Sequence, residues 1–167
     1  TVAGKKGTET NKAKLDVIYI LDKSGSMKED FGGTSKRIAA SNAITALTKS
    51  LKQNANIDAR FSMVTFSGNK TTGMWGQGDT KTWDDAEVAV SWTTDAGTIE
   101  RGSKPTSNGG TNYQAGIRTA KELLTSKRAG AMTAVIFISD GDPTFYYNPD
   151  GYTRGDGNND GNGGADN

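Results

Sequence analysis

Five oxygen-bearing side chains stand where they could hold a metal ion together. They are Asp22, Ser24, Ser26, Thr111 and Asp140. Carboxylates and hydroxyls are hard oxygen ligands, which suit Mg²⁺ or Mn²⁺ with water in the remaining positions. Only two of the five carry a negative charge. A cation bound here would therefore stay electron-poor and could accept a further carboxylate from another molecule.

The composition excludes several other kinds of chemistry. The 167-residue sequence contains neither histidine nor cysteine. Disulfide frameworks, zinc ribbons, thiol nucleophiles and histidine-dependent triads are therefore ruled out, and any metal must be held by oxygen. The 20 Lys and Arg nearly balance the 19 Asp and Glu, so no global basic field attracts nucleic acid. The sequence has no run of about 18 apolar residues, so we expect no membrane insertion.

Three apolar segments rich in β-branched residues predict strands that are covered on both faces, as in a parallel sheet. They are residues 15–21, 59–67 and 133–139. A shorter alternating segment, 88–92, predicts an edge strand.

Apolar residues at helical spacing predict two helices. The first begins after Ser35, which can cap it, and ends near Asn54. The second begins after Thr111 and ends near residues 127–128. We expect the first helix to bury Ala40, Ile44, Leu47 and Leu51, and the second to bury Tyr113, Ile117, Ala120 and Leu124.

The alternation of strands and helices predicts an α/β fold with a doubly wound, largely parallel sheet flanked by helices. We expect residues 1–14 to be a linker or the end of a preceding domain, and residues 15–143 to form the domain core. A loop insertion spans about 68–110, and 144–167 is a loop or insertion rich in Gly, Asn and Asp. Fewer strands can be recognised than the usual number of about 5–6, so we expect the domain to be C-terminally incomplete.

This fold class brings the candidate metal ligands together. Ligands of open parallel sheets bind beyond the carboxyl ends of the strands. Asp22 directly follows the first predicted strand and Asp140 directly follows the last, so both are expected at the same edge. Thr111 follows two glycines and opens the second predicted helix.

Three motifs in this order resemble the metal-ion-dependent adhesion site of the von Willebrand factor A (VWA) domain family. They are Asp22-x-Ser24-x-Ser26, the Gly-Gly-Thr that ends at Thr111, and Ser139-Asp140-Gly. The resemblance covers roughly residues 15–143. It implies that the five candidate ligands bind a divalent cation directly or through water, and that an Asp or Glu of a partner protein completes its coordination.

The sequence departs from the family pattern in two places, and both limit what the resemblance implies. The segment before Gly-Gly-Thr is long and carries tryptophans, and the family's last strands and C-terminal helix are absent. With the missing cysteines and the polar surface, the pattern resembles the VWA domain of Gram-positive pilus tip adhesins. The resemblance implies a non-enzymatic, extracellular, cell-wall-anchored module at a pilus tip. Its expected partners are host or extracellular-matrix proteins, and pilus backbone subunits through the parent chain.

Two other functions remain as alternatives. Acidic residues with Mg²⁺ at the rim of an α/β sheet also describe phosphohydrolases, in which an Asp attacks phosphorus. Such a site would need a carboxylate at position 24, where this sequence has Ser24, and a lysine that reaches the phosphate, whereas Lys23 should point away. The other alternative is an intracellular assembly module, because VWA domains also occur in cytoplasmic complexes.

The remaining motifs offer weaker candidates. Asp156, Asn158 and Asp160 match the first half of a Ca²⁺ loop, but the twelfth position is Asn167 rather than Glu, so a flexible acidic loop is the competing interpretation. The tripeptide at 154–156 is Arg-Gly-Asp, which integrins recognise. In a segment this rich in Gly and Asp, the tripeptide can also occur by chance. The last candidates are the three tryptophans, Trp75, Trp83 and Trp92. They could contact a ligand, or they could pin the insertion onto the domain.

Overall fold

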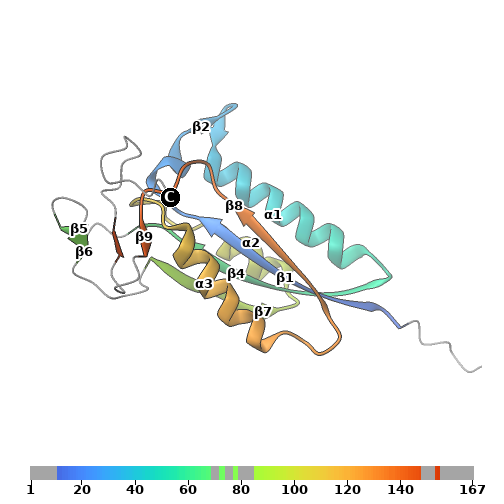
Figure 1. Ribbon diagram of the computed structural model, residues 1–167. Coiled ribbons are helices and arrows are strands. Elements are labelled where there is room, and N and C mark those ends of the chain that lie inside the picture. Colours follow the sequence, from blue (N-terminus) through green and yellow to red (C-terminus); the bar gives the residue numbers. More distant parts are fainter. Residues whose placement is uncertain (1–10, 69–71, 74–76, 79–84, 148–152, 155–167) are drawn as a thin grey trace, which may run out of the picture.

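A four-stranded sheet forms the centre of the protein in the computed structural model, which describes residues 11–68, 72–73, 77–78, 85–147 and 153–154 (Figure 1). The strand order is β7-β4-β1-β8. The central strand β1 (Ala13–Asp22) runs parallel to β4 (Ile57–Phe66) and to β8 (Met132–Ile138). The edge strand β7 (Ala86–Thr93) is antiparallel to β4. The predicted α/β class with a largely parallel sheet is confirmed.

Helices cover both faces of this sheet (Figure 1). Helices α1 (Lys36–Gln53) and α2 (Ala96–Gly102) pack on one face, and α3 (Tyr113–Leu123) packs on the other. Alternate residues of β1 point to the two faces, so Tyr19 joins the core under α1 while Ile20 joins the core under α3.

Short elements connect these layers. The 3₁₀ turn η1 (Gly25–Lys28) leads from β1 into a hairpin of β2 (Asp30–Phe31) and β3 (Thr34–Ser35), and η2 (Leu124–Ser126) extends α3. A second small sheet has the order β5-β6-β10-β9. Its strands are β5 (Thr72–Gly73), β6 (Gln77–Gly78), β9 (Tyr146–Tyr147) and β10 (Thr153–Arg154).

The predicted boundaries of strands and helices agree with the structure within a few residues. Ser35 caps α1 as expected, because its side chain accepts a hydrogen bond from the backbone N–H of Ile38. The inner faces of the helices were predicted less well. Leu47 and Ile117 are exposed, because Thr48 and Gly116 occupy the inward positions beside them. Thr48 makes a buried hydrogen bond to the Tyr19 hydroxyl, and Gly116 lies so close to Phe66 that a Cβ would clash.

The structure differs from the sequence predictions in two further places. Besides the predicted edge strand, the segment 68–110 contains the helix α2, which was not predicted and which begins where Asp95 caps the backbone N–H groups of Gly97 and Thr98. Strand β8 is not covered on both faces in the described part of the protein. It is an edge strand there, with Val135 and Phe137 half exposed on the face that α3 only partly covers.

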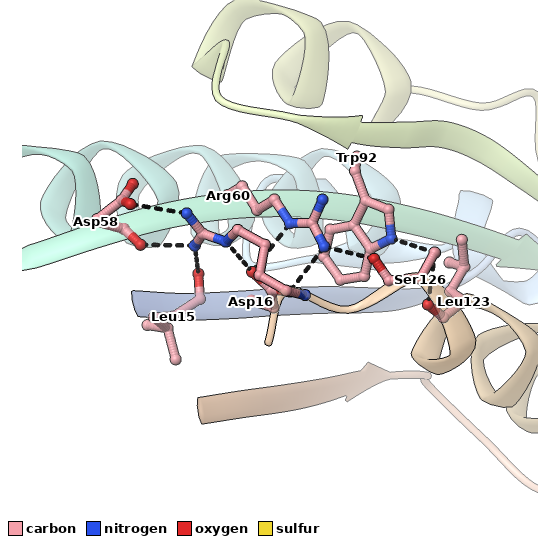
Figure 2. Close-up of polar contacts among 8 residues, drawn as sticks. Leu15, Asp16, Asp58, Arg60, Trp92, Leu123 and Ser126 are labelled. Carbon is pink, nitrogen blue, oxygen red and sulfur yellow. Dashed lines mark hydrogen bonds and ion pairs between the residues drawn. The ribbon is translucent and has the colours of Figure 1, made fainter. Parts of the chain in front are cut away.

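A cluster of charged residues closes the amino end of the sheet (Figure 2). Asp16 of β1 is fully buried, and its carboxylate accepts hydrogen bonds from the guanidinium groups of Arg60 and Arg128 at 2.8–3.0 Å. Arg128 also bonds the Asp58 carboxylate at 2.8 Å. Burial acts to raise the pKa of Asp16, but these hydrogen bonds outweigh it and lower the pKa to about 2. The cluster ties β1, β4 and the turn before β8 together.

Within the described residues, no helix has both the length and the apolar composition needed to cross a membrane.

Candidate metal centre

Asp22 ends β1 and is buried at the carboxyl end of the sheet. Its Oδ1 accepts the backbone N–H of Ser24 at 2.7 Å, and its Oδ2 accepts the hydroxyl of Ser139 at 2.6 Å. Ser139 follows β8, the strand beside β1, so its bond to Asp22 joins the ends of two parallel strands. Tyr113 of α3 lies behind, with its hydroxyl 3.0 Å from that of Ser139. These contacts fix the orientation of the Asp22 carboxylate.

A chain of hydroxyls links the end of β1 to Asp140. The hydroxyls of Ser24 and Ser26 are 3.1 Å apart, and Ser26 donates to Oδ1 of Asp140 at 2.9 Å. The ammonium of Lys36 lies 2.8 Å from the other carboxylate oxygen, Oδ2. Residues 114 positions apart in the sequence therefore meet at one edge of the sheet, as parallel pairing of β1 with β8 requires.

Thr111 reaches the same edge through a tightly packed loop. The backbone carbonyl of Gly109 accepts the N–H of Gly25, and Gly110 donates its N–H to the carbonyl of Gly68. Gly109 has a φ of +82°, and a Cβ there would lie 2.4 Å from the Gly68 carbonyl oxygen. Only glycine tolerates both constraints. The two glycines before Thr111 therefore allow this loop to approach η1.

These elements enclose a polar cavity of about 370 Å³ at the carboxyl end of the sheet. Four of the five predicted ligands line it, namely Ser24, Ser26, Thr111 and Asp140. Asp22 is the exception, because it is buried behind Ser24. The structure thus brings the predicted ligands into one site, at the place that the sheet topology predicts.

The donor set of this site suits a hard divalent cation. Burial raises the pKa of Asp22, the hydrogen bonds from Ser139 and Ser24 oppose this, and the nearby Asp140 carboxylate raises the pKa further. Among the described residues, no lysine or arginine forms an ion pair with Asp22. No group of three or more His, Cys, Asp or Glu side chains forms a metal cluster there either. Two carboxylates and several neutral hydroxyls are ligands that Mg²⁺ and Mn²⁺ accept.

A comparison of the sequence with protein-family models identifies the fold. Residues 16–153 match the model of the von Willebrand factor type A domain. The chain belongs to this family. A search of curated proteins found no match. In this VWA domain, residues of all three sequence motifs, including Ser26, Thr111 and Asp140, line the cavity at the carboxyl end of the sheet.

Solved structures of pilus proteins share the fold of this VWA domain. The vWF domain of the type V pili tip protein Mfa5 from Porphyromonas gingivalis superposes with a TM-score of 0.61 and 18% identity, over 81% of this chain and 40% of that one. The pilus adhesin SpaC from Lactobacillus rhamnosus GG gives 0.62 and 22%, over 81% and 16%. The adhesive tip pilin GBS104 from Streptococcus agalactiae gives 0.56 and 19%, over 80% and 47%. The VWA domain spans less than half the length of each of these structures.

Most of the other sequence candidates lie outside the described residues. These are Trp75, Trp83, the Ca²⁺ loop candidates Asp156, Asn158 and Asp160, and most of the Arg-Gly-Asp tripeptide. Trp92 is described, and it lies beside Arg60 and Ser126, next to the Asp16 cluster and away from the candidate metal site (Figure 2). Its ring stacks against the Arg60 guanidinium at 4.3 Å and its Nε1 donates to Ser126 at 2.8 Å. These contacts match the interpretation that this tryptophan pins its segment onto the domain.

Two residues of the site were not predicted from the sequence. Ser139 precedes a predicted ligand but had no assigned role, although it orients Asp22. Lys36 begins a predicted helix, where a lysine usually faces solvent, and nothing in the sequence indicates its ion pair with Asp140. Lys23 does point away as expected, because its ammonium lies 2.6 Å from the Glu87 carboxylate.

Proposed function

We propose that this VWA domain is an extracellular adhesion module that binds a protein partner through a divalent cation. Asp22, Ser24, Ser26, Thr111 and Asp140 would hold Mg²⁺ or Mn²⁺ directly or through water. The cation would supply a coordination position for an Asp or Glu carboxylate of the partner. The observation that carries the proposal is the meeting of Asp22 and Asp140 through Ser24, Ser26 and Ser139 beside an open polar cavity.

The protein's own residues support this role in three ways. Ser139 and the backbone of Ser24 hold the buried Asp22 carboxylate in one orientation. Ser26 orients Asp140. The two glycines let the loop before Thr111 approach Gly68 and η1, and Thr111 then lies in the wall of the cavity, which has room for a partner's side chain.

An adhesive role is favoured over phosphoester hydrolysis. A phosphohydrolase would need a second carboxylate beside Asp22 and a lysine directed at the phosphate. Position 24 is a serine, and Lys23 is engaged by Glu87 outside the cavity. We expect no turnover of a generic phosphoester in the presence of Mg²⁺.

The fold shared with pilus adhesins supports a place at a pilus tip. We extend the proposal to host or extracellular-matrix proteins as partners and to cell-wall anchoring through the parent chain, which would also contact the pilus backbone subunits.

Solid-phase binding to a panel of immobilised extracellular-matrix proteins tests the proposal. Binding should disappear in EDTA, return with Mg²⁺ or Mn²⁺, and fall when the carboxylates of the immobilised protein are amidated. Asp22→Ala should abolish binding, whereas Asp30→Ala, which removes an exposed carboxylate of the neighbouring hairpin, should leave it unchanged. Binding that persists in EDTA and in Asp22→Ala would contradict the proposal.

A further inference from the structure

Lys36 is the one cationic side chain among the described residues that line the cavity. It is the first residue of α1, and its ammonium lies between two carboxylates. The nitrogen is 2.8 Å from Asp140 Oδ2 and 2.6 Å from Glu29 Oε2. The Asp140 side chain is only 8% exposed, so the ion pair on its side is largely shielded from water.

This contact uses the oxygen of Asp140 that Ser26 leaves open. Ser26 donates to Oδ1, and Lys36 occupies Oδ2. The hydrogen bonds to Asp140 and then to Glu29 raise the pKa of Lys36 to about 12, so the ammonium is charged at every physiological pH. The acidic groups that face this cavity are Glu29, Asp140 and Asp142, with Asp22 buried behind Ser24.

We propose that Lys36 is an internal counter-cation that competes with the divalent metal for Asp140 and thereby lowers the metal affinity of the site. The inference rests on the proposed function, because it concerns the same cation. A metal held by Asp140 would stand beside the ammonium, and two positive charges at this distance repel each other. Metal binding therefore requires Lys36 to give up its bond to Asp140 and keep Glu29 alone.

Lys36 also connects two segments at the rim of the site. The backbone N–H of Lys36 donates to the Glu29 carbonyl at 3.0 Å and closes the base of the hairpin β2–β3. The ammonium then connects that base to Asp140 after β8. Lys36 thus provides part of the charge compensation at Asp140 that a bound cation would provide.

The test is direct titration of Mn²⁺, with the free ion measured by electron paramagnetic resonance. The variants are Lys36→Met, Lys36→Arg and, as a matched control on the same helix, Lys49→Met, which removes an exposed ammonium 3.9 Å from the Glu100 carboxylate. Loss of one partly exposed ion pair predicts about fivefold tighter Mn²⁺ binding in Lys36→Met. Lys36→Arg and Lys49→Met should bind as the wild type does.

Equal or weaker Mn²⁺ binding by Lys36→Met would overturn the inference, because Lys36 would then support the site rather than compete with the metal. Melting in EDTA checks that this variant is folded, and Lys36→Gln, which is shorter and also uncharged, must give the same change in affinity. Absence of Mn²⁺ binding in both the wild type and Lys49→Met would instead remove the proposed metal site itself.

Discussion

The two ends of β1 each carry a buried aspartate, and the two aspartates have opposite surroundings. At the amino end, Asp16 accepts hydrogen bonds from two guanidinium groups and one backbone N–H. At the carboxyl end, Asp22 accepts one hydroxyl and one backbone N–H, and no described cation pairs with it. The pKa of Asp16 is lowered to about 2, whereas that of Asp22 is raised by its burial.

We infer that Asp16 has a structural role, whereas Asp22 belongs to a binding site. The amino-end cluster is complete, because Arg60 and Arg128 balance Asp16 and Asp58. The carboxyl end has excess negative charge around an open cavity, and Lys36 offsets only part of it. Burial of an uncompensated carboxylate costs free energy, which an added cation would recover. We therefore expect the two ends to respond differently to mutation, metal and pH.

The largest expected effect is that of neutralising Asp16. Asp16→Asn leaves two guanidinium groups without their partner and should lower the free energy of unfolding by about 3–5 kcal/mol. The matched change at the other end, Asp22→Asn measured in EDTA, should leave it unchanged or raise it, because burial disfavours the ionised carboxylate. Urea unfolding of both variants checks this. Equal destabilisation by the two substitutions would break the comparison.

The second largest expected effect is the stabilisation of the domain by a bound metal ion. Mg²⁺ or Mn²⁺ at a hundredfold excess over its Kd adds about 2.7 kcal/mol to the free energy of unfolding. Thermal melting in EDTA and in each metal measures the shift, which Asp22→Ala should abolish. Asp58→Ala, at the amino end, should keep the shift although its melting temperature is lower. An equal shift in Asp22→Ala would mean that the metal binds elsewhere.

Acid should lower the stability of the domain by protonating Asp16 at the amino end of the sheet. The pKa of Asp16 is about 2 in the folded protein and 3.8 ordinarily, so its contribution is complete above about pH 5 and is largely lost by about pH 2. The contribution is about 2 kcal/mol. The difference in unfolding free energy between wild type and Asp16→Asn should shrink by that amount between pH 6 and pH 2. A difference that does not vary with pH would show that the ion pairs do not lower the pKa of Asp16.

The smallest expected effect is at Trp92. Trp92→Phe removes the hydrogen bond to Ser126 and weakens the contact with Arg60, which together should cost about 1 kcal/mol of stability. Because Trp92 lies at the amino end, the Kd for Mn²⁺ should stay the same. Mn²⁺ titration and urea unfolding of this variant check both expectations, and an altered Kd would indicate that the two ends are coupled.

The order of elements and the position of the site could be predicted from the sequence. Apolar segments 15–21 and 59–67 are long and rich in β-branched residues, so their strands were identified correctly. Asp22 and Asp140 each follow such a strand, and the geometry of parallel sheets then places them together. These predictions depend on local sequence patterns, which do not change with the way the elements pack against one another.

Features that depend on packing could not be predicted in this way. The helix α2 is short and has few apolar residues, so its only sequence signal is the cap at Asp95. Exposure of Val135 and Phe137 depends on which elements lie beside β8, and their apolar composition alone indicated burial. The pairs Asp16–Arg128 and Lys36–Asp140 join residues more than a hundred positions apart, and charge alone does not identify such partners.

We propose that the carboxyl end of the sheet binds a divalent cation through the five predicted ligands. Anomalous diffraction from a crystal of the domain soaked in Mn²⁺ tests this most directly. We expect an anomalous difference peak in the cavity bounded by Ser24, Ser26, Thr111 and Asp140, and no such peak in Asp22→Ala. A wild-type crystal whose only manganese peaks lie outside this cavity would contradict it.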